Sequence, residues 1–410
     1  MKKFLLLGAA AMMACAVNAQ STIEKVWTVE ASDSQVVTVR GATGYGDAVF
    51  TLDQSAGVVE EWKDGAKVAT YEVNKFCAEK ELGEMVKVKD ESGEEVEKFQ
   101  SYVIWTCAMT DDAGNIMVGV GTGAGSAVTC QNFVLLPVAD RNAMQLLHID
   151  AADFPSSDVA IGRMDIPRRI IGDIAGDGAY MYITPANSPV MAVMYVGLDD
   201  DGVVYCDPEN SWGLLSGATF DSQTSAASFL TVEDILNATE EGEVAAKTYL
   251  RWRSSGTSTW DAESSSFVKN AAIQNGAASA GMDIFKIGDV EYMVVPAKSS
   301  NGNRGCSVEV YELTTNTSVA YFDAESLTDV YECSIIALPN ADGVSANIYV
   351  SAKAQCFGLL KFTPGESAIE SIAADNAAVE YYNLQGVKVA NAENGLFIKK
   401  QGNKATKVVL

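Results

Sequence analysis

A recurring turn constrains the fold of this chain more than any other feature of its sequence. Short runs of β-branched and aromatic residues alternate with Asp/Asn/Gly turns from about Ile23 to Phe362. Such turns between two apolar runs are typical of β-hairpins. Lys63-Asp64-Gly65, for example, predicts a hairpin between a strand that ends at Trp62 and a strand over residues 67–73.

The turn returns at a regular spacing. Equivalent points just after it are Val49, Ile116, Tyr180, Tyr292 and Ile348. The gaps between them are 67, 64, 112 and 56 residues, and because 112 is twice 56, a degenerate unit is expected near Tyr249-Leu250. Six units of about 55–65 residues are typical of a β-propeller. The expected fold is therefore all-β, with a propeller of about six blades over residues 20–366. A two-sheet sandwich is the alternative, which explains the strands but not the recurring turn.

Composition and charge narrow the class of protein further. The chain is 48% hydrophobic, enough for a large core, and its formal net charge of −25 argues against binding to nucleic acid or anionic lipid. No segment shows sustained helical periodicity, and residues 229–236, with Thr231 as a cap, predict one short helix.

The N-terminus predicts export. Lys2 and Lys3 precede an apolar stretch over residues 4–16, and a small-x-small site ends at Ala19, before Gln20. Residues 1–19 are thus expected to be a signal peptide. Cys15 leaves lipidation as an alternative. No later apolar run reaches the length of a membrane helix.

Seven cysteines follow the predicted cleavage site, scattered and without a C-x-x-C pair, so neither a zinc ribbon nor a thioredoxin-like motif is indicated. An odd number cannot pair completely within one molecule. Cys107 and Cys130 lie on neighbouring predicted strands and are a candidate bridge, whereas most of the others are expected to be small buried residues.

The C-terminal residues differ in composition from the rest. Residues 369–410 carry five lysines against four acids, whereas residues 20–368 carry about 50 acids against 22 basic residues. Two hairpins are predicted here, one turning at residues 383–386 and one at residues 401–404. Residues 367–410 are thus expected to form a small, separate, β-sandwich-like module.

This module resembles the C-terminal sorting domain of the type IX secretion system of Bacteroidetes. The resemblance covers about the last 42 residues and implies passage across the outer membrane, with the type IX machinery as a partner. More generally, the body resembles secreted Bacteroidetes β-propeller proteins of uncharacterised function, through Arg40-Gly41, Tyr45, Asp47, Gly57-Val58 and residues 112–118. The residues that carry the sorting resemblance are Asn383, Leu384, Gln385, Gly386, Gly395, Lys407 and Leu410.

Arginine and tryptophan side chains form the candidate ligand site. Both residue types are enriched at binding hot spots, and tryptophan suits the faces of sugars. Blade packing and solubility are the competing explanations. The candidates are Arg163, Arg168 and Arg169 on a proline-containing loop, and Arg251, Trp252, Arg253 and Trp260 around a Ser/Thr-rich stretch.

Catalytic and cofactor motifs are weak. The glycine-rich residues 119–125 fail the dinucleotide spacing and predict a loop, and Asp199-Asp200-Asp201 lacks the spacing of a calcium loop. His148, the only histidine, lies in an apolar run and is expected to be hydrogen-bonded and partly buried. No metal, cofactor or catalytic residue is assigned.

These patterns predict a secreted or surface-displayed propeller that binds a glycan or protein ligand without transforming it. A hydrolase or lyase with carboxylates on the propeller axis is the first alternative. A structural envelope protein is the second.

Overall fold

The structure is a computed structural model of the 410-residue chain. It describes residues 20–30, 42–122, 130–150, 166–184, 190–215, 225–228, 249–252, 256–261, 264, 266–270, 281–325, 329–330, 333–353, 355–365, 379–383, 388–389, 396–401 and 404–409. The chain divides into two compact units, one of residues 22–363 and one of residues 1–21 with 364–410.

Residues 22–363 contain six four-stranded antiparallel sheets among the described residues. Sheet 1 consists of β2 (Thr43–Tyr45), β3 (Ala48–Asp53), β4 (Val58–Lys63) and β5 (Ala66–Tyr71). Sheet 2 consists of β8 (Val103–Thr110), β9 (Ile116–Gly121), β10 (Cys130–Leu136) and β11 (Gln145–Asp150). Sheet 3 consists of β12 (Ile166–Asp173), β13 (Gly178–Thr184), β14 (Val190–Leu198) and β15 (Val204–Leu215).

The remaining three sheets repeat this pattern. Sheet 4 consists of β16 (Ser225–Ser228), β17 (Tyr249–Trp252), β18 (Gly256–Asp261) and β19 (Ser266–Lys269). Sheet 5 consists of β20 (Asp283–Ile287), β21 (Val290–Lys298), β22 (Arg304–Glu312) and β23 (Thr317–Phe322). Sheet 6 consists of β24 (Cys333–Pro339), β25 (Ala346–Ala352), β26 (Cys356–Thr363) and, from the other end of the unit, β1 (Thr22–Glu30).

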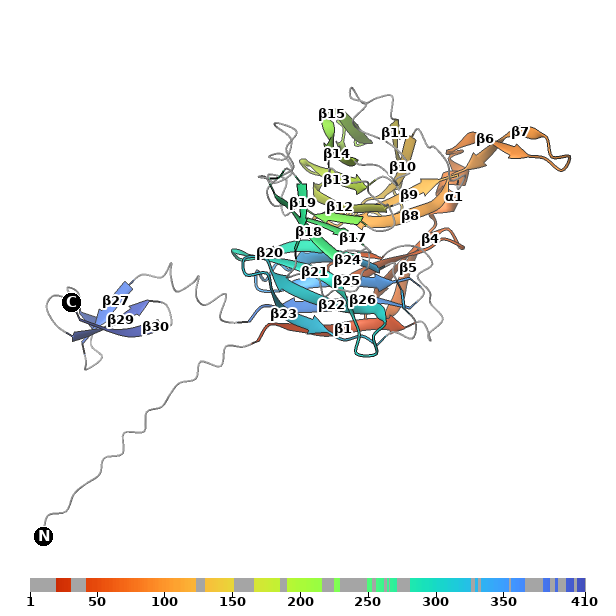
Figure 1. Ribbon diagram of the computed structural model, residues 1–410. Coiled ribbons are helices and arrows are strands. Elements are labelled where there is room, and N and C mark those ends of the chain that lie inside the picture. Colours follow the sequence, from red (N-terminus) through yellow and green to blue (C-terminus); the bar gives the residue numbers. More distant parts are fainter. Residues whose placement is uncertain are drawn as a thin grey trace, which may run out of the picture. The chain divides into compact units, whose positions relative to one another are not determined.

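The first strands of the sheets form a closed ring. β2, β8, β12, β16, β20 and β24 contact one another in this order, and β24 contacts β2. Each sheet is therefore a blade whose first strand lies nearest a common axis, which confirms the predicted six-bladed propeller (Figure 1).

β1 closes the ring. It pairs antiparallel with β26 from Thr22↔Thr363 to Glu30↔Cys356, as the outermost strand of blade 6. Its Trp27 and Val29 are buried in a cluster that joins blade 6 to blade 1, with Val49 and Trp62 on the blade 1 side. The last blade is thus built from both ends of the propeller sequence.

The repeat found in the sequence marks one position in every blade. Val49, Ile116, Tyr180, Tyr292 and Ile348 all lie on second strands, and the degenerate unit expected near Tyr249 begins with β17, the second strand of blade 4. The predicted hairpin turn at Asp64-Gly65 is confirmed. Both residues have positive φ, 50° and 76°, which a two-residue turn between twisted strands requires.

Apolar side chains on both faces of the blades form the core. In β9, Met117 packs between blades 2 and 3, while Ile116 and Val118 pack between blades 1 and 2. Because alternate residues of a strand point to opposite faces, a blade covered on both faces reads as a continuous apolar run.

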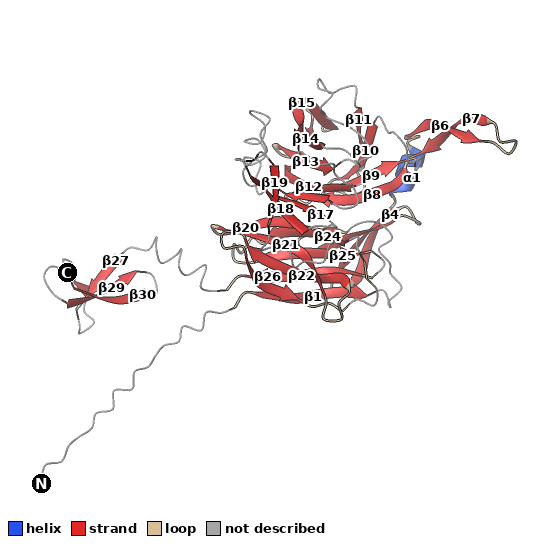
Figure 2. Ribbon diagram, in the orientation of Figure 1, coloured by secondary structure: helices blue, strands red, loops and turns tan. Residues whose placement is uncertain are grey.

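One segment departs from the predicted strands. The strand expected over residues 67–73 ends at Tyr71, and Val73–Glu79 form the helix α1 (Figure 2). Val73 and Cys77, one helical turn apart, are buried between blades 1 and 2. A hairpin of β6 (Gly83–Lys89) and β7 (Glu95–Ser101) follows before blade 2 begins. The helix predicted over residues 229–236 lies outside the described residues.

The C-terminal module contains one four-stranded antiparallel sheet among its described residues. Its order is β28 (Lys388–Val389), β27 (Val379–Tyr382), β29 (Leu396–Gln401) and β30 (Lys404–Val409). Both predicted hairpins are present, β27 with β28 and β29 with β30. The described strands of the module thus form one sheet.

Ring closure predicts that truncation at the two ends of the chain affects the stability of the propeller very differently. Deleting residues 20–30 should lower the free energy of unfolding of the propeller by at least about 3 kcal/mol, because burying Trp27 and Val29 contributes roughly 1.5–3 kcal/mol each. Deleting residues 367–410 should change it by less than about 0.5 kcal/mol, since the described strands of the tail form a sheet of their own. Urea unfolding of both truncated chains measures the difference.

The point variant Trp27→Ala serves if the first truncation does not fold. It should lower the same free energy by about 3–5 kcal/mol. A tail truncation that unfolds the propeller would contradict this account of ring closure.

Candidate functional site

The described ligand candidates lie on blades 3 and 4, which are neighbours in the ring. Arg168 and Arg169 lie on β12, the innermost strand of blade 3, and not on a loop as predicted. The strand accommodates Pro167 through a register irregularity between Pro167 and Arg169. Arg251 and Trp252 lie on β17 and Trp260 on β18, where only their backbone is described, and Arg163 and Arg253 lie outside the described residues.

Arg169 reaches across the propeller axis. Its Nη1 donates to Asp283 Oδ2 at 2.5 Å, and the same nitrogen lies 3.3 Å from the carbonyl oxygen of Ala337. Nη2 lies 3.4 Å from Asp112 Oδ1. β12 and β20 are not neighbours in the ring, so this side chain connects blade 3 to blades 2, 5 and 6.

The carboxylate of Asp283 is fully engaged. Its Oδ2 also accepts from the backbone N–H of Ala337 at 2.8 Å, and its Oδ1 accepts from that of Ile284 at 2.9 Å. The side chains of Arg169 and Asp283 are 7% and 2% exposed. The two backbone N–H donors offset part of the cost of burying the Asp283 carboxylate. Here it cross-links the axis.

A second buried carboxylate joins the recurring turns of blades 2 and 3. Asp111 accepts from the backbone N–H of Asn115 at 2.7 Å and from that of Ile174, in the equivalent turn of blade 3, at 2.9 Å. Burial raises the pKa of Asp111, against these hydrogen bonds, which lower it. Its neighbour Asp112 exchanges two hydrogen bonds with the backbone of Gly172. The turn that predicted the fold therefore also fastens one blade to the next.

The same end of the ring is fastened where blade 6 meets blade 1. Tyr349, fully buried, donates from its hydroxyl to the carbonyl oxygen of Gly46 in the first turn of blade 1. Its ring lies against Gly44, where an added Cβ would fall 1.8 Å from a ring carbon. Only glycine fits at this position.

The buried carboxylates of the described residues serve contacts between blades. The buried carboxylates among the described residues are those of Asp111 and Asp283, and both are held by N–H donors. Glycoside hydrolysis needs two carboxyl groups with a sugar between them. The described residues also bring together no group of three or more His, Cys, Asp or Glu that would hold a metal ion.

The other sequence candidates have ordinary structural roles. His148 lies on β11 with its Nδ1 2.7 Å from Asn132 Oδ1, so it is hydrogen-bonded as predicted, although exposed. Gly119–Gly121 belong to β9 and not to a loop, whereas residues 123–125 lie outside the described part. Asp199 caps the turn between β14 and β15 by accepting from the backbone N–H of Asp201 and Val203.

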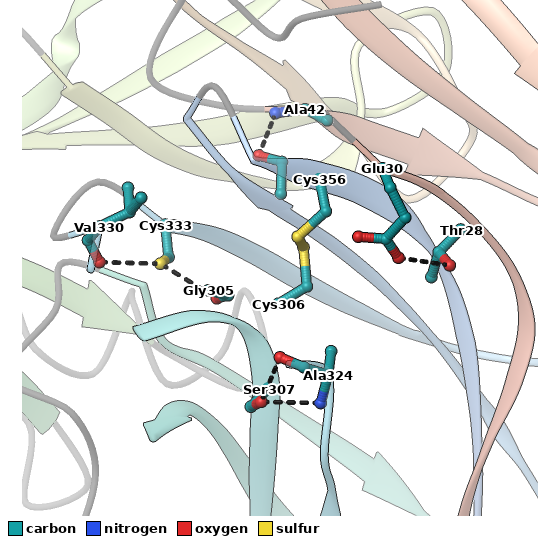
Figure 3. Close-up of a disulfide and its surroundings, with 11 residues drawn as sticks. Thr28, Glu30, Ala42, Gly305, Cys306, Ser307, Ala324, Val330, Cys333 and Cys356 are labelled. Atoms are coloured by element: carbon teal, nitrogen blue, oxygen red, sulfur yellow. Dashed lines mark hydrogen bonds between the residues drawn. A yellow bond between two sulfur atoms is a disulfide. The ribbon is translucent and has the colours of Figure 1, made fainter. Parts of the chain in front are cut away.

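A disulfide joins the two blades next to the closing strand. Cys306 on β22 and Cys356 on β26 are bonded, with Cα atoms 6.3 Å apart (Figure 3). Cys333 lies nearby as a buried thiol and donates to the carbonyl oxygen of Gly305. The bridge considered between Cys107 and Cys130 does not fit the fold. Their strands lie on either side of β9, so the backbones are about two strand spacings apart, farther than a disulfide reaches.

The sorting and cleavage residues lie in the other unit. Asn383 directly follows β27, Lys407 lies on β30, and Gln20 lies two residues before β1. Ala19, Leu384–Gly386, Gly395 and Leu410 lie outside the described residues.

Sequence reasoning missed the partners that matter most at the axis. Asp283 and Asp112 carried no motif, although Asp112 stands in the recurring turn. Their pairing with Arg169 needs contacts across as many as 114 residues of sequence, which no local pattern encodes. No sequence pattern distinguished Cys306 and Cys356 from the other five cysteines after residue 19.

Comparison with known proteins adds no family. Neither a family model nor a curated protein matches the chain. The solved structures that are similar include, each at 11% identity, dihydro-heme d1 dehydrogenase NirN in complex with DHE (TM-score 0.32) and a mutant of the B. megaterium levansucrase (TM-score 0.34). The matches cover 90% and 78% of this chain. They cover 65% of NirN, less than two thirds of its length, and 87% of the levansucrase. We base no functional assignment on either.

The contact between Arg169 and Asp283 predicts that the free energy of unfolding depends on both side chains. Arg169→Met should lower the free energy of unfolding by about 3–5 kcal/mol, because the Asp283 carboxylate would lose its charged partner in a buried site. The double variant Arg169→Met/Asp283→Leu should recover most of this loss. Urea unfolding of the three chains measures the coupling. Equal effects of the single and double variants would contradict a buried ion pair.

The disulfide predicts redox-dependent stability. It closes a 50-residue separation, for which the loss of chain entropy in the unfolded state gives about 4 kcal/mol. Reduction should lower the free energy of unfolding of the wild-type chain by about 2–5 kcal/mol and leave Cys306→Ala/Cys356→Ala unchanged. Cys333→Ala is the control and should keep the redox dependence.

Proposed function

We propose that this chain is an exported, non-catalytic β-propeller that displays a ligand-binding surface outside the cell. The observation that carries the non-catalytic part is the axial cross-link. Arg169 and Asp283 are occupied with each other and with backbone groups of blades 5 and 6. This supports a scaffold role for the axis over the alternative of paired catalytic carboxyls.

Three observations support export. The first is the signal-like N-terminus ending at Ala19, and the second is the C-terminal resemblance to a type IX sorting domain. The third is the disulfide between Cys306 and Cys356, since disulfides persist mainly in oxidising compartments outside the cytosol. Among the described residues, no helix is long and apolar enough to cross a membrane. The signal-like N-terminus, the sorting resemblance and the disulfide favour the cell surface or the medium as destination, reached through the periplasm.

The ligand is a protein or a glycan. The glycan hypothesis rested on arginine and tryptophan side chains, and one of these, Arg169, is engaged at the axis. A protein ligand is favoured by the hairpin inserted between blades 1 and 2. The structural envelope protein remains the alternative in which no ligand is bound.

Two measurements test this proposal. A chain lacking residues 367–410 should stay in the periplasm of a host with a working type IX system, because the signal peptide still acts while the sorting module is gone. A matched control replaces only residues 84–100, in the β6–β7 hairpin, with a Gly/Ser loop and should be exported normally. Normal export of the tail truncation would contradict the sorting assignment.

The non-catalytic part is tested separately. The mature chain, residues 20–410, is screened on a glycan array, and any sugar that binds is incubated with the protein and analysed for products. Binding without cleavage supports the proposal. Release of oligosaccharide would establish the hydrolase or lyase instead.

A further inference from the structure

The inserted hairpin is the part of the propeller unit that its own fold does not cover. β6 and β7 pair only with each other among the described strands, and they extend away from the blades (Figure 1). Every side chain from Met85 to Gln100 is exposed or half-buried. A two-stranded hairpin open on both faces is only marginally stable in water, and its two edges carry unpaired backbone groups.

The hairpin is nevertheless well formed at both ends. At its tip Asp90 Oδ1 accepts from the backbone N–H of Ser92 and Glu94, and Gly93 supplies the positive φ of the turn. At its base Gln100 Nε2 donates to the carbonyl oxygen of Thr122 at 2.7 Å, and the Thr122 hydroxyl donates to Glu84. Blade 2 therefore anchors the β6–β7 hairpin, residues 83–101, which we call the arm.

The strand register places apolar and oppositely charged side chains together on one face of the hairpin. Met85 lies opposite Phe99, and these two apolar side chains are 59% and 46% exposed. Lys87 lies opposite Glu97, and Lys89 lies opposite Glu95. From the tip toward the base, this face of β7 therefore presents two acids and then an aromatic ring.

The two edges of the arm differ in charge. On this face β6 presents lysines to its outer edge, whereas β7 presents Glu95 and Glu97. The whole chain carries a net charge of −25, which attracts basic partners and repels acidic ones. The β7 edge matches the partners that this charge favours, because opposite charges on neighbouring strands stabilise a sheet.

We propose that the outer edge of β7 binds an extended segment of a partner protein by strand addition, and that this segment carries basic residues at alternate positions and an apolar residue two positions beyond them, at the end that lies beside Phe99. Across the sheet, its basic side chains lie next to Glu95 and Glu97 of β7, which in turn lie next to Lys89 and Lys87 of β6. The charge therefore alternates from strand to strand. Its apolar side chain covers Phe99. The backbone supplies the hydrogen bonds and the alternate side chains supply specificity, as in other cases of strand addition. This inference rests on the proposed function, of which it specifies the ligand.

A displayed library of random peptides of about twelve residues tests the proposal on the mature chain, residues 20–410. Selected peptides should share basic residues at alternate positions and an apolar residue two positions away, on the C-terminal side if the added strand is parallel to β7 and on the N-terminal side if it is antiparallel. Glu95→Lys/Glu97→Lys should weaken binding of a selected peptide at least tenfold. The matched control Glu91→Lys/Glu94→Lys makes the same change of charge at the tip of the same hairpin and should weaken binding less than threefold.

Backbone pairing is tested with N-methylated peptides. Methylation of alternate backbone nitrogens on one edge of a selected peptide should abolish binding, and methylation on the other edge should not. Equal weakening by the two charge variants would overturn the proposal, since it would indicate general charge attraction. Selection of no arm-dependent peptide would also overturn it.

A second copy of this chain is the other possible occupant. Sedimentation that shows a dimer lost on replacement of residues 84–100 by a Gly/Ser loop would overturn the proposal in favour of self-association. A monomer at the same concentrations supports it. The export and glycan measurements are independent of these results, so failure here leaves the proposed function standing.

Discussion

Closure of the ring is the constraint on which the rest of the propeller depends. Each blade buries both of its faces against neighbours, so an open ring would expose the apolar faces of two blades at once. The closing blade is therefore built from both ends of the sequence, with β1 laid along β26. Trp27 from β1 packs with Phe357 of blade 6, which also contacts Trp62 of blade 1. The Cys306–Cys356 disulfide reinforces the neighbouring junction, between blades 5 and 6.

The two ends of the blades are used differently. At the end that carries the recurring turns, hydrogen bonds from Asp111, Asp112 and Tyr349 tie the turns of adjacent blades together. At the other end, long connections lead from the outermost strand of one blade to the innermost strand of the next. The connection between β5 and β8, residues 72–102, contains α1 and the β6–β7 hairpin. The inserted hairpin therefore belongs to a connection between blades and not to one of the recurring turns.

The sequence predicted the repeat but not the contacts between repeats, and the reason is physical. Turn chemistry and apolar runs are local, so the positions of Val49, Ile116 and Tyr180 on equivalent strands followed from spacing alone. The pairing of Arg169 with Asp283 depends on the ring bringing blades 3 and 5 to the same axis. α1 was missed for a different reason. Its seven residues include β-branched Val73 and follow a strand directly, so the local pattern continues that of β5, and only the burial of Val73 and Cys77 distinguishes the helix.

The buried axis also explains why recognition is best sought on the insertion. A side chain that holds four blades together cannot release its partners for a ligand without loosening the scaffold, because an unpaired charge in a buried site is strongly unfavourable. Arg169 and Asp283 are in that position, 7% and 2% exposed. The β6–β7 arm is under no such constraint. Its side chains contribute little to the propeller core, so the chain can present Glu95, Glu97 and Phe99 to a partner while the ring remains closed. Stability and recognition are thereby placed on different residues of one fold.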